Sequence, residues 1–446
     1  MEKTPKQDLS QIMTFKNTTF LFIFFLLMAI TFFFLSDQVA KDCLIIRNSK
    51  YFDGDSSVYV SNKTIVIRKD KITEILGNEN LQQIDILKNA CNSVDLSGKY
   101  LFPGLIDSHT HLLAVDAQRV TDWKVALEKS AARPNMTRLF LGEKNARSML
   151  LAGFTTLRDL GNSGNFLDFD LRTRSLNAPE FFPDIIISGP GIAVAPTQIN
   201  LRTNSAEYRV INEASEIDGI LAEYKKRNVP WIKLYADNSN HSVGIGKSLL
   251  RTLTSRAHEL KMKVAVHALY KESVANALNS DSDSIEHFDE VPGSDLPKFK
   301  RMPFVITTDF TLETCERIPL DRICVAKLNL LRTRLRWLQN NGFPLVFGSD
   351  SVLDFSSNFK SRGQASLASL TNLTQMGLSP AEAITSATST AAEMLGLKIG
   401  KIQETYTANL VAYKEDPLKD LNNLKIRTLV ISRGFIICKS SNECRP

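Results

Sequence analysis

Two histidines, His109 and His111, lie one residue apart at the end of the apolar run LFPGLIDSHTH. Because side chains alternate between the two faces of a strand, residues i and i+2 point the same way and can bind one metal ion together. The pair alone is a weak signal, since two histidines on a strand more often serve packing or lie at the surface. It predicts half of a metal site at the end of a strand.

Further side chains that could bind a metal follow other short apolar runs. Lys233 lies in WIKLY, His267 in VAVHA, His287 in SIEH and Asp350 at the end of PLVFGSD. Zinc and similar ions accept neutral imidazole nitrogen and carboxylate oxygen, and a catalytic site keeps one position open for water. An ammonium group cannot bind a cation. Lys233 therefore fits only as a carbamate formed with carbon dioxide, whose two oxygens could bridge two metals.

The runs that carry these residues alternate with helical stretches from about Leu101 to Leu395, which is typical of βα units and a parallel sheet. Eight such units predict an α/β fold, the TIM (β/α)8 barrel, whose active site lies at the C-terminal ends of its strands. The candidate ligands fall at those ends, on the first, fourth, fifth, sixth and eighth strands. The predicted strands are 105–111, 155–161, 184–189, 231–235, 264–268, 284–287, 304–308 and 344–350.

The two flanks of the barrel are rich in short alternating strands. The segment from about Cys43 to Tyr100 contains TIVIRKD and KITEILGN, and the segment from about Gly400 to Ile437 contains ANLVAY and TLVISRGFII. We expect these two ends to pair into one small β-sandwich beside the barrel. The predicted organisation is an N-terminal segment (1–40), the β-sandwich (41–100 and 397–446) and the barrel (101–396).

The chain resembles the amidohydrolase superfamily of metal-dependent hydrolases over almost everything after Lys41. The matching pieces occur in the family's order: PGLIDSHTH, GFTTLRDLG, WIKLYAD, VAVHA, SIEH, GSD, MGLSPAEAITSATSTAAEMLGL and TANLVAYKEDPLKDL. Within the superfamily the chain looks most like the group that contains Xaa-Pro dipeptidases (prolidases) and imidazolonepropionase. Asn409 departs from the family tail, which usually has aspartate there, and this puts nothing catalytic in doubt.

This resemblance implies a centre with two divalent metal ions, zinc being the expected metal. If Lys233 is an ordinary lysine instead of a carboxylated one, the site holds a single metal bound by His109, His111, His267 and Asp350. In the two-metal assignment His109, His111 and Asp350 bind one ion, His267 and His287 bind the other, and carboxylated Lys233 lies between them.

The ligand set also predicts a reaction. Water bound to a metal loses its proton near neutral pH, and two ions about 3.5–4 Å apart can hold both a nucleophile and a substrate carbonyl oxygen. A bridging hydroxide is therefore expected to attack the carbonyl, with the oxyanion stabilised by the metal charge. Asp350, at the open end of the barrel, is placed to act as general base and then as general acid toward the leaving nitrogen. The expected reaction is hydrolysis of a carbon–nitrogen bond.

The substrate is less defined, because specificity in barrel enzymes depends on variable βα loops. A dipeptide or N-acyl amino acid with a free carboxylate is the first choice, and a cyclic amide or a lactone is the second. Arg158 could meet the carboxylate, but we expect it to pair with Asp159 instead. The candidate substrate contacts are Tyr235, His241, Tyr270 and Arg158.

The net charge of +6 and the isoelectric point of about 8.8 are mild. These values fit an anionic substrate or surface, but the positive charge is too small and too dispersed to indicate nucleic acid. A small molecule is the expected partner, and a homo-oligomer is compatible with the sequence. Two other classes stay open. A catalytically dead binding scaffold would have lost ligands, and all six are present; an interaction domain with structural histidines would bind no metal.

The N-terminus carries a membrane-insertion signal. The run from Phe20 to Leu35 is strongly apolar except at Thr31, and it follows Lys3, Lys6 and Lys16. The following residues, SDQVAK, match a cleavage site poorly, so an uncleaved signal anchor is favoured over a cleaved signal peptide. We therefore expect a membrane-anchored or exported enzyme whose catalytic domain lies outside the cytoplasm.

Six cysteines fit that location, because an oxidising compartment favours disulfides. None is needed as a metal ligand. Spacing alone does not fix the connectivity, and buried free thiols in a reducing cytosol are the alternative. The expected pairs are Cys315 with Cys324, Cys438 with Cys444 and Cys43 with Cys91.

Overall fold

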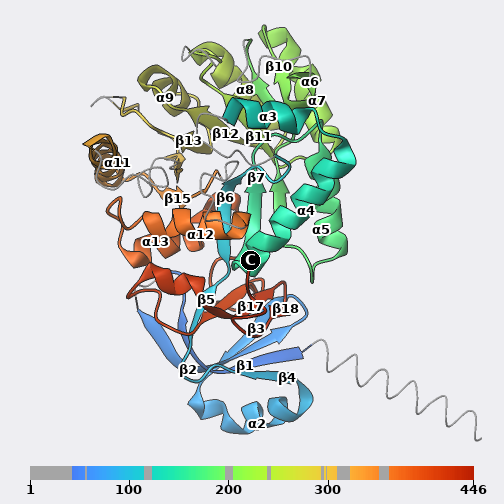
Figure 1. Ribbon diagram of the computed structural model, residues 1–446, viewed down its shortest axis with the longest axis vertical. Helices are drawn as coiled ribbons and strands as arrows, with labels where there is room; N and C mark the ends of the chain where they lie inside the picture. Colours follow the sequence, from blue (N-terminus) through green and yellow to red (C-terminus); the bar gives the residue numbers. More distant parts are fainter. Residues whose placement is uncertain are drawn as a thin grey trace, which may run out of the picture.

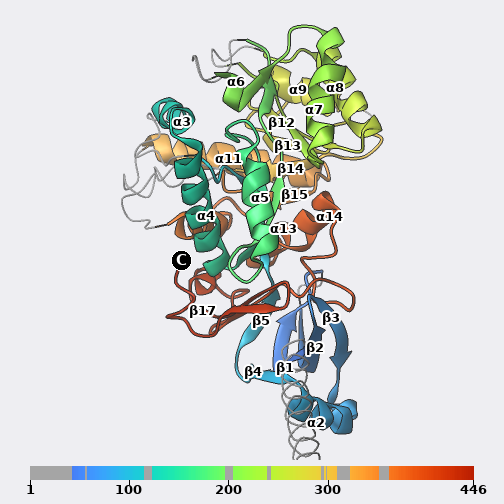
Figure 2. The same cartoon turned by 90° about the vertical axis from the view of Figure 1, so that its right-hand side faces the viewer.

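The computed structural model has an α/β part and a β-rich part, which lie one above the other in Figure 1 and, from the side, in Figure 2. The apolar helix predicted for Phe20–Leu35 lies outside the described residues. Among the described helices, none is both long and apolar enough to span a bilayer. The structure describes residues 43–55, 58–114, 123–195, 204–238, 243–292, 296–297, 299–308, 322–350 and 361–446.

All eight strands predicted for the barrel are present, and the seven pairings among them and the short strand β9 are parallel. Their runs of β-branched and apolar residues are mostly buried, as expected where helices cover a parallel sheet. The strands of this part are β6 (Leu105–Thr110), β7 (Phe154–Asp159), β8 (Asp184–Ile187), β9 (Gly191–Ala193), β10 (Tyr208–Val210), β11 (Trp231–Tyr235), β12 (Lys263–Ala268), β13 (Ser284–His287), β14 (Phe304–Thr307) and β15 (Leu345–Phe347).

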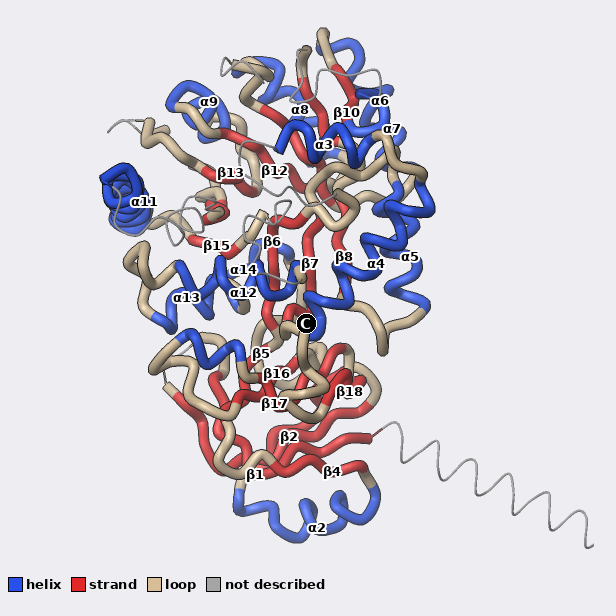
Figure 3. Tube along the Cα trace, viewed as in Figure 1, coloured by secondary structure: helices blue, strands red, loops and turns tan. Residues whose placement is uncertain are grey.

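Helices surround these strands, as the blue and red tubes of Figure 3 show. At the start of α13, the Ser379 hydroxyl accepts a hydrogen bond from the amide of Glu382, and Pro380 occupies the first turn. The helices are α3 (Trp123–Ala131), α4 (Asn135–Leu151), α5 (Leu167–Asn177), α6 (Asn204–Glu207), α7 (Ile217–Lys226), α8 (Lys247–Glu259), α9 (Lys271–Leu278), α11 (Arg322–Asn340), α12 (Arg362–Asn372), α13 (Pro380–Ser386) and α14 (Ser389–Leu395), with one 3-10 turn, η3 (Ala214–Glu216).

The arrangement is of the α/β-barrel type, but the prediction of one closed barrel is wrong in one respect. In the described residues the strands form two parallel sheets, β6-β7-β8 and β10-β9-β11-β12-β13-β14-β15, instead of one continuous ring. The third predicted strand, β8, pairs with β7, whereas the short strand that follows it, β9, pairs with β11.

The ring of strands is interrupted between β8 and β9 and between β15 and β6, and each gap has a local physical cause. Between β8 and β9, Gly189 has a left-handed φ of 67° and Pro190 has no amide hydrogen to donate, so the ladder cannot continue. Between β6 and β15, the carboxylate of Asp107 replaces ladder bonds by accepting the amides of His109 and Ser349. One more hydrogen bond crosses the same gap, from the Asp350 amide to the carbonyl of His109.

Strands from both ends of the chain join in the β-rich part, as expected, and hydrogen bonds connect them into one eight-stranded sheet. The reason is β1, which pairs with β4 through its first half and with β5 through its second. The elements are β1 (Cys43–Phe52), β2 (Tyr59–Arg68), β3 (Lys71–Leu76), η1 (Asn78–Asn80), α2 (Leu81–Ala90), β4 (Asn92–Asp95), β5 (Tyr100–Pro103), β16 (Leu410–Tyr413), η4 (Leu421–Lys425), β17 (Arg427–Ser432) and β18 (Phe435–Cys438).

Two predicted disulfides are present in this sheet. Cys43 at the start of β1 is bonded to Cys91 beside β4, and Cys438 at the end of β18 is bonded to Cys444. The third predicted disulfide joins Cys315 and Cys324, and Cys315 lies outside the described residues. The first bond joins residues 48 positions apart, whereas the second joins residues 6 apart.

Replacing Cys43 and Cys91 together by serine should lower the free energy of unfolding by about 2–4 kcal/mol, because that bond closes the longer loop in the unfolded chain. Denaturant unfolding followed by circular dichroism measures the change. The matched control replaces Cys438 and Cys444, whose short loop should cost less. Equal losses in the two variants would contradict the loop-length explanation.

Candidate metal centre

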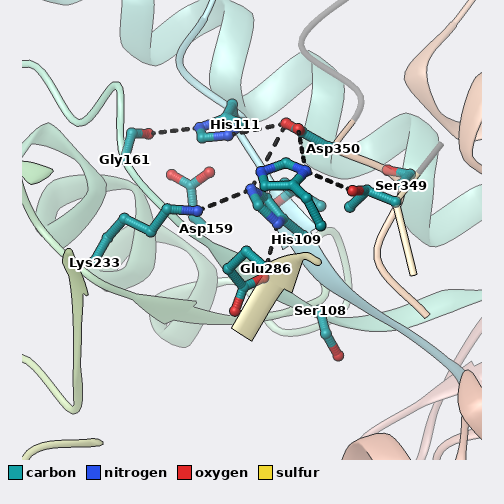
Figure 4. A network of polar contacts seen from close by, with 12 residues as sticks. Ser108, His109, His111, Asp159, Gly161, Lys233, Glu286, Ser349 and Asp350 are labelled. Atoms are coloured by element: carbon teal, nitrogen blue, oxygen red, sulfur yellow. Dashed lines mark hydrogen bonds and ion pairs between the residues drawn. The ribbon is translucent and has the colours of Figure 1, made fainter. Parts of the chain in front are cut away.

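Six side chains predicted as ligands come from five strands of the α/β part or from residues just after them, and the structure brings all six together. Four of them converge in Figure 4, where His109 and His111 meet Lys233 on one side and Asp350 on the other. Each of the six is at most 7% exposed. The set is His109, His111, Lys233, His267, His287 and Asp350.

His109, His111 and Asp350 form the tightest group. Oδ1 of Asp350 lies 3.1 Å from Nε2 of His111 and 3.7 Å from Nε2 of His109. One ligand atom from each residue lies within 4.8 Å of the others. Ligands about 2.1 Å from a tetrahedral zinc ion are roughly 3.4 Å apart, so these distances fit three ligands of one ion.

Lys233, His267 and His287 complete the set on the other side. Nζ of Lys233 lies 3.3 Å from Nε2 of His109, and Oδ2 of Asp350 lies 3.9 Å from Nδ1 of His287. The rings of His267 and His287 meet edge to face with centroids 4.5 Å apart.

Two of the six residues have a backbone conformation that is rare for residues with a side chain. His287 has a φ of 75° and Asp350 a φ of 48°, both in the left-handed region. This conformation interrupts the strand alternation, so that Glu286 and His287 can both face the centre although they are neighbours. Such backbone strain is typical of functional sites.

Outer partners hydrogen-bond to the second ring nitrogen of two histidines, and a carboxylate lies beside that of a third. Nδ1 of His111 faces the carbonyl of Gly161 at 3.3 Å, and Nδ1 of His287 lies 2.6 Å from the hydroxyl of Thr308. Nδ1 of His109 lies 2.8 Å from Oε2 of Glu286. Partners of this kind fix the orientation and tautomer of ligand histidines, leaving the other nitrogen for the metal.

The electrostatics favour the protonation states that bind metals. Burial lowers the pKa of His109 to about 4, and it lowers the pKa values of His267 and His287 well below their usual range, so these imidazoles are neutral near pH 7. Burial alone would raise the pKa of Asp350, but the histidines beside it outweigh this effect and keep it below the ordinary value. Burial lowers the pKa of Lys233 to about 8. These residues therefore fit a divalent metal.

Arg158 does not pair with Asp159, and that prediction is wrong. Neighbouring residues of β7 point to opposite faces, so Arg158 reaches Glu286 at 2.9 Å while Asp159 accepts the amide of Leu112. The Arg158 side chain is fully buried, and its ion pair uses the carboxylate that also contacts His109. Glu286 is thus a site residue that the sequence reasoning missed. A charged residue inside the short run SIEH was the available signal.

Of the other predicted substrate contacts, Tyr235 and Tyr270 lie among the described residues. The Tyr235 ring is buried beside His267, with centroids 5.2 Å apart. Tyr270 precedes α9, where its amide is held by the hydroxyl of Ser273. His241 lies outside the described residues.

Gly348→Ala should loosen the centre, because a Cβ there would lie 2.6 Å from Cβ and 3.0 Å from the backbone nitrogen of His109. We expect a loss of about 1–3 kcal/mol in stability together with weaker metal binding. Calorimetric titration of the metal-free protein measures the binding. Gly219→Ala, in α7 with open space around it, is the control and should keep full affinity. Unchanged metal affinity in the Gly348 variant would contradict this packing role.

An α/β-barrel-type fold with histidine, lysine and aspartate side chains gathered from its strands defines a class of proteins with a metal site at the strand ends. Comparison with known proteins narrows this class. The model of the amidohydrolase family matches residues 100–436, and the chain belongs to that family. Membership supports a metal-dependent hydrolase acting on carbon–nitrogen bonds, in agreement with the resemblance seen in the sequence.

Individual relatives are more distant. The chain is 28% identical over 233 residues to an imidazolonepropionase from Fusobacterium nucleatum, a match that covers 47% of this chain and 53%, about half, of that protein. A solved Xaa-Pro dipeptidase with bound methionine is 22% identical, with a TM-score of 0.68 over 88% of this chain and 99% of that one. Molinate hydrolase is 18% identical, with a TM-score of 0.72 over 89% and 94%. These two likenesses concern the fold.

Proposed function

We propose that this protein hydrolyses the amide bond of a dipeptide or an N-acyl amino acid at a centre of two divalent metal ions, with zinc as the first candidate. The observation that supports this most strongly is the convergence of six buried side chains of ligand type at the ends of five strands. A family relative named as an imidazolonepropionase and a structural neighbour named as a Xaa-Pro dipeptidase both point to carbon–nitrogen bonds.

In this proposal His109, His111 and Asp350 hold one ion, and His267 and His287 hold the other. Lys233, as a carbamate, lies between them. When bound, the ions supply an activated water and positive charge for the substrate carbonyl oxygen.

Asp350 has the second role of moving protons. Its carboxylate is ionised near pH 7, because the histidines beside it lower its pKa. It can accept a proton from the attacking water and pass it to the leaving nitrogen, which would otherwise depart as a poor amide anion. Tyr235, beside His267, is the first candidate among the described residues for a contact with the substrate.

A second candidate function is hydrolysis of a cyclic amide or a lactone at a single metal ion. The observation that favours it is the compactness of the group formed by His109, His111 and Asp350. In that case Lys233 is an ordinary lysine, and its ammonium remains close to His109.

A substrate screen tests both candidates. The purified chain is assayed against Xaa-Pro dipeptides, N-acyl amino acids, hydantoins and lactones, with zinc supplied and after chelation. Turnover of a linear amide that disappears on chelation supports the first proposal. Chelator-sensitive turnover of cyclic substrates alone supports the second, and chelator-resistant turnover would contradict both.

We also propose that the catalytic part works outside the cytoplasm, exported or held at the membrane by the run Phe20–Leu35. The two disulfides and the lysines before that run support this location. Thiols counted in denatured protein that was isolated without reductant test it. Two reactive thiols or fewer are expected, and six would contradict the proposal.

A further inference from the structure

A buried ion pair lies directly behind the candidate metal centre. Arg158 in β7 and Glu286 in β13 meet at 2.9 Å, and both side chains have no exposed surface. Glu286 lies below His109 in Figure 4, on the side away from Asp350. A fully buried pair of charges is costly to desolvate, so its retention here needs a reason beyond stability.

The two oxygens of Glu286 have different partners. Oε1 accepts hydrogen bonds from Arg158 and from the hydroxyl of Ser284, at 2.9 Å and 2.6 Å. Oε2 lies 2.8 Å from Nδ1 of His109. One oxygen therefore anchors the carboxylate, and the other is directed at a candidate ligand.

Arg158 is itself held from several directions. Its guanidinium donates to the carbonyl of Ser108 at 2.6 Å and to the hydroxyl of Ser284 at 3.0 Å, and it stacks over the ring of Trp231 at 4.4 Å. Ser108 immediately precedes His109. The same arginine thus fixes both the backbone before His109 and the carboxylate beside its ring. Because these contacts use its donors inside the protein, a substrate carboxylate is not its partner.

We propose that Arg158 and Glu286 are positioning residues for the metal centre: they keep the proton of His109 on Nδ1 and direct the free electron pair of Nε2 toward the metal. This inference rests on the proposed function, since it assigns His109 as a ligand. Neither residue touches the reacting atoms. They act through the orientation and tautomer of one imidazole.

The first test is the metal affinity of Glu286→Gln, measured by competition between the protein and a chromogenic chelator for zinc. Loss of an outer carboxylate partner typically weakens binding by about 10–100-fold, and we expect a loss of that size. The matched control is Glu207→Gln. Glu207 forms an equally buried ion pair with Arg138, at 2.6 Å, but contacts none of the six candidate ligands. The control should bind zinc as the unmodified chain does.

The second test separates positioning from folding. Arg158→Met leaves the Glu286 charge buried without its counterion, so this variant should be the least stable. The double variant Arg158→Met, Glu286→Gln removes both charges, and its thermal stability should recover toward that of the unmodified chain. Its zinc affinity should stay low, since His109 still lacks its partner. Recovery of stability and affinity together would overturn the proposal.

The third test reads the tautomer without any metal. The chain has 6 histidines, so selective nitrogen-15 labelling gives a small set of ring signals. In the metal-free protein, His109 should carry its proton on Nδ1, and Glu286→Gln should mix the two tautomers while Glu207→Gln should not. An unchanged tautomer with unchanged zinc affinity in Glu286→Gln would overturn the inference. Failure of the unmodified chain to bind zinc would instead contradict the proposed function itself.

Discussion

Asp350→Asn should lower kcat by at least about a hundredfold while much of the metal stays bound. The amide oxygen of asparagine can still approach a cation, and Asp350 lies within ligand distance of His111 and His109. An amide cannot accept the proton of the attacking water, and loss of such an acid–base group commonly costs about 10²–10⁴ in rate. The effect should therefore fall on turnover more than on metal content.

Steady-state kinetics on the best substrate from the screen, together with metal analysis of the same preparation, measure both effects. Asp168→Asn is the control, because Asp168 is also a fully buried aspartate but accepts the amide of Gly189, remote from the six candidate ligands. It should keep kcat near the unmodified value. Near-normal turnover by the Asp350 variant would remove this residue from the proton-transfer role.

Lys233→Met should reduce the bound metal from two equivalents to one and lower kcat by at least about a hundredfold. Losing a residue that only orients a ligand costs up to about a hundredfold in metal affinity or activity, and Lys233 is proposed as a ligand itself. Methionine keeps an unbranched stem in a side-chain position that is 1% exposed, so the fold should survive. What disappears is the amine, whose Nζ lies 3.3 Å from His109.

The pH dependence of carboxylation gives this prediction a second measurement. Carbon dioxide reacts with a neutral amine, and burial lowers the pKa of Lys233 to about 8. The amine is mostly protonated at pH 6 and mostly neutral at pH 9, so uptake of the second equivalent by metal-free protein should increase with pH and with added bicarbonate. If Lys233→Met binds as much metal and turns over as fast as the unmodified chain, Lys233 is an ordinary lysine.

The sequence predicted the positions of the strands and the residues that meet at their ends. Runs such as WIKLY and VAVHA are short and mostly apolar, which is typical of buried strands, and a repeated βα order gives a strong expectation of a parallel sheet. Once the order is known, the strand ends must lie together. Lys233 and His267, far from His109 along the chain, could therefore be assigned to one centre before any coordinates were known.

What the sequence could not predict depends on single backbone conformations. The left-handed φ of His287 places Glu286 and its neighbour in the same interior, whereas simple alternation would separate them. The turn at Gly189 and Pro190 ends β8, and the short strand β9 that follows it was not predicted. The partner of Arg158 lies in the other sheet, on β13, and neighbours in sequence gave the wrong partner.

The β-rich part illustrates the same limit. Alternating patterns at both ends of the chain correctly predicted that they would join, and β5 does pair with β16. They did not show that β1 would pair along its length with both β4 and β5 and so connect all the strands into one sheet. Pairing partners depend on bends within a strand, which composition does not reveal.

The most direct test of the central claim is the metal content of the unmodified protein after supplementation and exhaustive removal of loose metal. The account predicts two equivalents of a divalent metal, removed by a strong chelator together with the hydrolase activity and restored with it when zinc is returned. Protein that binds no divalent metal under these conditions, or that hydrolyses its substrate equally well without metal, would contradict the account.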